Sequence, residues 1–111
     1  MAAVIPVWVP TGVSVDSGRD GAVLVFGECE ELRLSRGEAE ALAGALERAA
    51  MSKSWREKIE VEERGEDAPV VLRMDDGPVA LAFGRDGESF RVETYFWPDA
   101  AAELADALRR A

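Results

Sequence analysis

Apolar and polar residues alternate along most of this chain, in short runs that end at Gly and Asp. A period of two is typical of strands that bury one face. The predicted strands span residues 4–9, 13–16, 22–26 and 31–34, and then 57–63, 70–74, 79–83 and 89–96. Turns are predicted at SGRDG (17–21), DDG (75–77) and GRDG (84–87), because Gly and Asp tolerate the positive φ of tight hairpins.

Each set of four predicted strands is followed by a helical pattern. Ser35 and Glu38 form an S-x-x-E capping box, which satisfies two backbone donors at the start of a helix. Pro98, followed by Asp99, is typical of the first turn of a second helix. Apolar residues then recur at helical spacing, at Ala39, Leu42, Ala43, Leu46 and Ala50 in the first helix and at Ala101, Leu104, Ala105 and Leu108 in the second.

The two halves of the chain can be aligned with each other. The matched residues are Leu24, Phe26, Gly27, Leu42, Ala43, Leu46 and Arg48 with Leu81, Phe83, Gly84, Leu104, Ala105, Leu108 and Arg110. Because strand and helix agree in one order, we interpret the pattern as a duplication. The predicted fold class is α+β, with two ββββα repeats whose antiparallel sheets carry the helices on one face. The chain is then a single domain over residues 1–111, made of two pseudo-repeats at about 4–51 and 56–111.

In this architecture the chain resembles a known group of proteins. Tandem ββββα units are the signature of PUR repeats and of the related whirly-like folds that bind single-stranded nucleic acid. The resemblance covers almost the whole chain and rests on the order of its elements. It implies a sheet face that binds single-stranded nucleic acid through basic and aromatic side chains.

Strand alternation also assigns each residue to one of two sheet faces. The core face is predicted to carry Val13, Val15, Leu24, Phe26, Leu32, Leu34, Ile59, Val61, Val70, Leu72, Met74, Leu81, Phe83, Phe90, Val92 and Phe96. The open face is predicted to carry Ser14, Asp16, Val23, Val25, Glu31, Arg33, Val71, Arg73, Ala80, Ala82, Arg91, Glu93 and Tyr95. An apolar centre with a charged rim is typical of a protein interface.

We therefore expect the open face to bind another protein in a regulatory role, with a homodimer as the expected assembly. The expected partner-binding residues are Val23, Val25, Arg33, Val71, Arg73, Arg91, Tyr95 and Trp97. An alternative is single-stranded nucleic acid, with the arginines holding phosphates and Tyr95 stacking on a base. The acidic runs ECEE (28–31) and EVEERGED (60–67) are interpreted as solvated edges and loops. Mimicry of DNA phosphates by these runs is a further alternative.

Composition limits the classes of function. A net charge of −9 opposes binding to phosphate backbones. The chain has no His, the commonest general base, and no P-loop, nucleophile elbow, CxxC or dinucleotide-binding motif. We expect no enzymatic activity, no cofactor and no metal site. The single Cys29 excludes an intrachain disulfide, and no segment reads as a signal peptide or membrane span. We therefore expect a cytoplasmic protein, and its use of Ala, Arg, Gly and Val is typical of a GC-rich bacterial genome.

Overall fold

The structure is a computed structural model that describes residues 3–5, 13–17, 21–26, 30–59, 68–86 and 89–110. Within them the chain forms eight strands and two helices: β1 (Ala3–Ile5), β2 (Val13–Ser17), β3 (Gly21–Phe26), β4 (Glu30–Ser35), α1 (Arg36–Ala50), β5 (Trp55–Lys58), β6 (Val70–Arg73), β7 (Val79–Asp86), β8 (Ser89–Phe96) and α2 (Pro98–Arg110). All strand pairs are antiparallel, and the sheet orders are β1-β2-β3-β4 and β5-β6-β7-β8. The predicted α+β class and the repeated ββββα order are confirmed.

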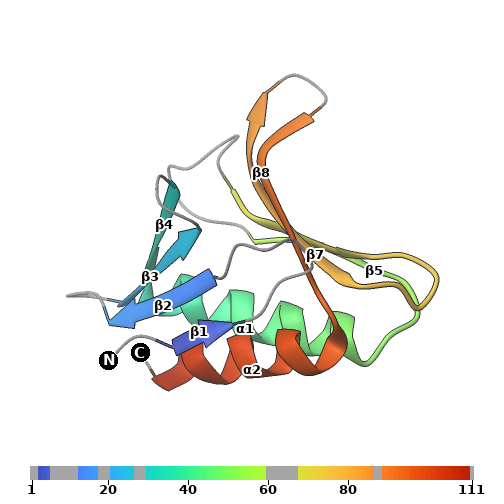
Figure 1. The fold of residues 1–111 in the computed structure, drawn as a ribbon, viewed down its shortest axis with the longest axis horizontal. Helices are drawn as coiled ribbons and strands as arrows, with labels where there is room; N and C mark the ends of the chain where they lie inside the picture. The colour runs from blue at the N-terminus through green and yellow to red at the C-terminus, as the bar shows by residue number, and fades with distance from the viewer. Residues whose placement is uncertain are drawn as a thin grey trace.

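The two helices lie side by side under the two sheets, which diverge above them (Figure 1). Each helix packs against strands of both repeats. Helix α1 contacts β3 and β4 of its own repeat and β5, β6 and β7 of the other. Helix α2 contacts its own β8 and also β1 and β2 of the first repeat. The two repeats therefore share one hydrophobic core.

The core is formed by the helix stripes and the inner sheet faces. Leu42, Leu46, Leu104 and Leu108 of the helices are fully buried, as their spacing predicts. Among the strand residues, Val13, Val15, Leu24, Leu32, Leu34, Leu81, Phe83, Val92 and Phe96 join them, together with Ile59. Fully burying an aliphatic side chain of this kind contributes about 1.5–3 kcal/mol. The positions of Val61 and of the side chains of Phe26 and Phe90 lie outside the described residues.

The predicted faces of β6 are wrong. Val71 is fully buried and Arg73 is only 8% exposed, whereas Met74 is 76% exposed. Val71 pairs with the core residue Leu81, so Val71 and Arg73 lie on the covered side. Val70, Leu72 and Met74 therefore belong to the opposite side, because a shift of one residue moves every side chain to the other face.

The reason for this shift lies in the turn between β6 and β7. Asp75 and Asp76 have φ of 48° and 61°, and the Gly77 N–H donates to the Met74 carbonyl at 2.8 Å, as in a type I′ turn. That turn would pair Leu72 with Val79, but the ladder pairs Leu72 with Ala80. The returning strand thus carries one extra residue before Val79, a bulge next to Pro78, which has no N–H to donate.

The start of α1 is as predicted. The Glu38 N–H donates to Ser35 Oγ at 3.2 Å, and the Ser35 N–H donates to Glu38 Oε1 at 2.9 Å. This reciprocal capping box fixes the point at which β4 ends and the helix begins.

Candidate functional site

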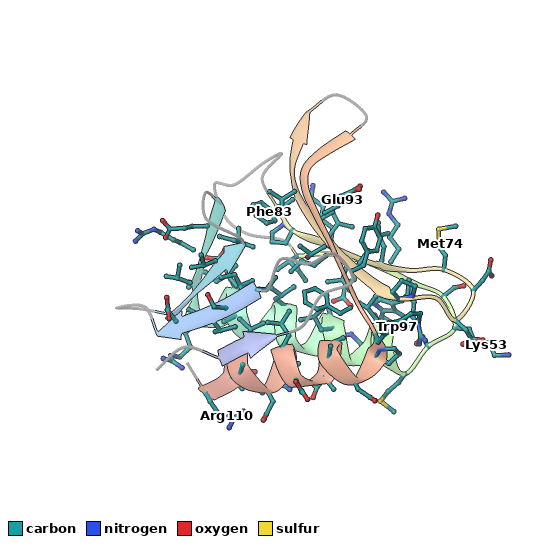
Figure 2. The ribbon with its side chains drawn as sticks, viewed as in Figure 1. Lys53, Met74, Phe83, Glu93, Trp97 and Arg110 are labelled. Carbon is teal, nitrogen blue, oxygen red and sulfur yellow. The ribbon has the colours of Figure 1, made fainter. Side chains whose placement is uncertain are left out.

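The second sheet presents one side away from the helices, which we call the outer face of the second sheet. The strand register arranges it in two rows that each cross four strands: Arg56–Leu72–Ala80–Tyr95 and Lys58–Val70–Ala82–Glu93. Met74 follows β6 and Trp97 follows β8. Continued strand alternation, two residues after Leu72 and after Tyr95, assigns both to this outer face. In Figure 2 Glu93, Met74 and Trp97 lie on one side of this sheet, and Phe83 lies on the side toward the first sheet.

The row Arg56–Leu72–Ala80–Tyr95 and the end of the face beyond it, at Met74 and Trp97, carry apolar side chains that are accessible or half-buried. Tyr95 is 36% exposed, Trp97 is 56% exposed, and Met74 is more exposed than either. Leu72 and Ala80 between them are half-buried. Val70 and Ala82 of the second row are buried, although they lie outside the core cluster. A cluster of exposed large apolar residues is typical of an interaction surface.

Charged side chains lie along the two edges of this face. Arg56 and Lys58 are exposed on β5, and Glu93 is exposed on β8. The Tyr95 hydroxyl donates to Glu93 Oε2 at 3.3 Å. Burial, and next the Glu93 charge, raise the pKa of Tyr95, so the phenol remains a neutral donor. Among the described side chains, the face therefore has a basic edge on β5, an apolar centre and the acidic Glu93 on β8.

The first sheet has an outer face of a different character. Val23 lies between Asp16 and Arg33, and Val25 lies between Ser14 and Glu31. Both valines are half-buried, and the Arg33 guanidinium is 3.7 Å from Glu31 Oε2. Predicted site residues Val23, Val25 and Arg33 thus lie on one sheet, whereas Tyr95 and Trp97 lie on the other. Because the sheets diverge (Figure 1), the structure divides these five residues between two surfaces.

Two of the predicted site residues are not on an outer face at all. Val71 packs in the core, and Arg73 lies beneath the second sheet at the end of α1. Arg91 lies in β8, and its side chain is outside the described residues. Sequence reasoning instead missed Arg56, Leu72 and Met74. In VVLRM (70–74) apolar residues occur at both odd and even positions, so alternation alone does not show which side faces the core. Pro78, which has no N–H to donate, was the feature of the sequence that could have indicated a bulge and a shifted register.

Arg73 is held by backbone carbonyls. Its Nη1 donates to the carbonyls of Ala49 (3.3 Å), Ala50 (3.0 Å) and Ser52 (2.6 Å), and its Nε donates to that of Gly77 (2.7 Å). The last carbonyls of a helix have no intrahelical partner and carry the negative end of the macrodipole. Arg73 satisfies them and anchors the β6–β7 turn to α1, so it is a structural residue.

Two ion pairs among the described residues join the two repeats on the helix side. Arg48 of α1 binds Glu57 of β5, with Nη2 2.6 Å from Oε2, and Arg109 of α2 binds Glu47 of α1, with Nη2 2.7 Å from Oε1. Hydrogen bonds from these arginines hold the pKa values of Glu57 and Glu47 below the ordinary range. A shallow groove between the helices is lined by Gly44, Met51 and Ala102 beside these two arginines. Since both arginines are engaged by carboxylates, the groove is no anion site.

Other classes of site find no support in the part of the chain that the structure describes. No group of three His, Cys, Asp or Glu side chains could hold a metal ion there. None of the described helices is long and apolar enough to cross a membrane. The outer face of the second sheet is therefore the candidate site.

Comparison with known proteins adds no family. No family model, no curated protein and no solved structure matches this chain. The case for function therefore depends on the geometry of this outer face.

Proposed function

We propose that the protein is a small, acidic, non-enzymatic binding module that acts through protein–protein contacts on the outer face of the second sheet. One observation carries this proposal: Leu72, Tyr95, Met74 and Trp97 form an accessible apolar surface, with charges at its edges. Interfaces typically have such an apolar, aromatic-rich centre and a polar rim. Tyr and Trp also dominate the residues that contribute most to binding.

The charges favour a protein partner over single-stranded nucleic acid. On the described outer faces Arg33, Arg56 and Lys58 are balanced by Asp16, Glu31 and Glu93. The buried Arg73 is unavailable to phosphates. With a net charge of −9 the molecule repels a polyanion, so the aromatic residues serve a protein partner better than a nucleic acid.

Photo-crosslinking tests this proposal. A photoreactive amino acid replaces Tyr95 on the outer face and, as a matched control, the exposed Glu103 of α2. We expect protease-sensitive adducts of higher mass from position 95 and none from position 103 when each protein is irradiated in cells. The adducts from position 95 should disappear when Leu72→Asp is introduced into the same protein, because a charge in the centre of the face opposes docking of any protein partner.

The other results have distinct meanings. Nuclease-sensitive adducts at position 95 would support the PUR-like or whirly-like alternative and contradict the proposal. Equal adducts at both positions, or none at either, would show that the outer face of the second sheet has no preferred partner.

A further inference from the structure

Among the side chains that the structure describes, the outer face of the second sheet carries basic residues at its β5 edge and the acidic Glu93 at its β8 edge. Lys58 and Arg56 lie on β5, whereas Glu93 lies on β8, three strands away. Adjacent strands are about 4.8 Å apart, so these edges are separated by roughly 14 Å. Lys58 and Glu93 stand in the same row but are too far apart to pair within one chain.

The two central strands differ in the size of their side chains. Strand β6 carries Leu72 and Val70, and strand β7 carries Ala80 and Ala82 directly beside them. In the accessible row, Leu72 therefore forms a ridge and Ala80 forms the groove next to it, whereas Val70 and Ala82 of the other row are buried. Such a surface is complementary in shape to a partner whose groove faces the Leu72 ridge and whose ridge faces the Ala80 groove.

A two-fold rotation supplies such a partner. An axis parallel to the strands, between β6 and β7, exchanges β5 with β8 and β6 with β7 and keeps each row in place. It sets Leu72 against the partner's Ala80, and it sets Lys58 against the partner's Glu93. In an isologous interface each such contact occurs twice.

We propose that a second copy of this chain binds here, with the outer faces of the two second sheets packed against each other about this axis. This inference rests on the proposed function and names the partner of the same surface. Aligned packing of two sheets is a common arrangement, because their twists match. Arg56 meets the partner's Tyr95 in the same arrangement, which places a cation beside an aromatic ring.

Charge-swap variants test this pairing by sedimentation equilibrium. Lys58→Glu and Glu93→Lys should each weaken dimerisation by about tenfold or more, because each places like charges opposite each other. The double variant Lys58→Glu/Glu93→Lys should return to within about threefold of the wild-type dissociation constant, since it restores opposite charges. The two single variants change the net charge in opposite directions, so a general charge effect would weaken one dimer and strengthen the other.

Matched controls separate local pairing from folding defects. Lys53→Glu and Glu103→Lys make the same charge changes at exposed positions away from this face and should leave the dimer unchanged. Circular dichroism should give the same spectrum for all variants. Because the double variant must recover binding, a variant that merely unfolds cannot imitate the expected result.

Each remaining outcome overturns the inference in a recognisable way. If the wild-type protein stays monomeric at every concentration, the proposed dimer does not form. The proposed function then stands only if the photoreactive residue at position 95 still crosslinks to a different protein. A dimer that the single swaps leave intact forms through a different surface. A double variant that fails to recover shows that Lys58 and Glu93 do not face each other.

Discussion

The Arg73 guanidinium donates its hydrogen bonds to backbone carbonyls at the C-terminal end of a helix and not to a carboxylate. Its hydrogen bonds reach the carbonyls of Ala49, Ala50 and Ser52 at the end of α1 and that of Gly77 in the next turn. Strand alternation predicted that Arg73 would lie on the open face. Its burial depends on carbonyls contributed from 21 to 24 residues away, which local alternation cannot reveal.

Substitution of Arg73 should therefore destabilise the fold. We expect Arg73→Met to lower the free energy of unfolding by roughly 3 kcal/mol, because the part-buried carbonyls of Ala50, Ser52 and Gly77 lose their charged donor. Arg73→Lys should recover only part of this loss, since an ammonium cannot reproduce the planar fork. Urea unfolding measures both variants. Arg33→Met, at an exposed position of β4, is the control and should change stability by less than about 0.5 kcal/mol; an equal loss at both positions would contradict the role assigned to Arg73.

Glycines show the same contrast between local pattern and packing at the scale of the elements. Gly21 was predicted to serve a turn, but it begins β3 without a positive φ. A Cβ there would lie 1.9 Å from the Leu34 carbonyl oxygen and 2.9 Å from the Arg36 nitrogen. Strand β3 thus approaches the β4–α1 junction so closely that only Gly fits. Gly37, in the first turn of α1, meets nothing within 4 Å.

The two glycines should respond to alanine in opposite ways. Gly21→Ala should cost about 3 kcal/mol or more, because backbone must move to admit the methyl group. Gly37→Ala should stabilise the protein by about 0.5–1 kcal/mol, since alanine has the higher helix propensity and a less flexible unfolded state. Thermal unfolding of both variants measures the difference. A neutral Gly21→Ala would show that β3 does not approach α1 in this way.

At the scale of the whole molecule, the two ββββα halves pack together as one unit. Helix α1 packs on strands of both sheets, and so does α2. Two ion pairs, Arg48–Glu57 and Arg109–Glu47, also join one repeat to the other. The covered sides of both sheets are thereby occupied, and what remains for function is the side that the helices do not reach.

These inter-repeat pairs make stability depend on pH. The folded-state pKa values of Glu47 and Glu57 are lowered from 4.5, chiefly by hydrogen bonds from Arg109 and Arg48. A carboxyl group whose pKa is lower in the folded state than in the unfolded state stabilises the fold at pH values above the unfolded-state pKa. This stabilisation is lost as the pH falls through the folded-state pKa. Since the pairs are largely exposed, we expect each to contribute below about 1 kcal/mol.

The Glu47→Gln/Glu57→Gln variant tests this contribution. It should be less stable than the wild type at neutral pH, and the difference should shrink as the pH falls below the ordinary carboxylate range. Denaturant unfolding across pH measures both proteins, with Glu103→Gln on the outside of α2 as the control. A difference that stays constant with pH would show that packing, and not charge, stabilises these contacts.

Several features that depend on contacts between near neighbours in the chain could be predicted from the sequence. The spacing of Leu42 and Leu46, the Ser35 capping box and the DDG turn follow from contacts within a few residues, and the structure confirms them. The same is true of the repeated order of strands and helices, because alternation and turn residues encode it.

The side of β6 that faces the core depends instead on packing between distant segments. One extra residue beside Pro78 shifts the register by one, so the side chains of β6 exchange faces. The carbonyls at the end of α1 then hold Arg73 on the covered side. The chain also could not show locally that Val23 and Tyr95 belong to diverging sheets, since the packing of two helices across both repeats fixes that arrangement (Figure 1). Register and sheet orientation arise from contacts between distant segments, and those contacts leave no period in the sequence.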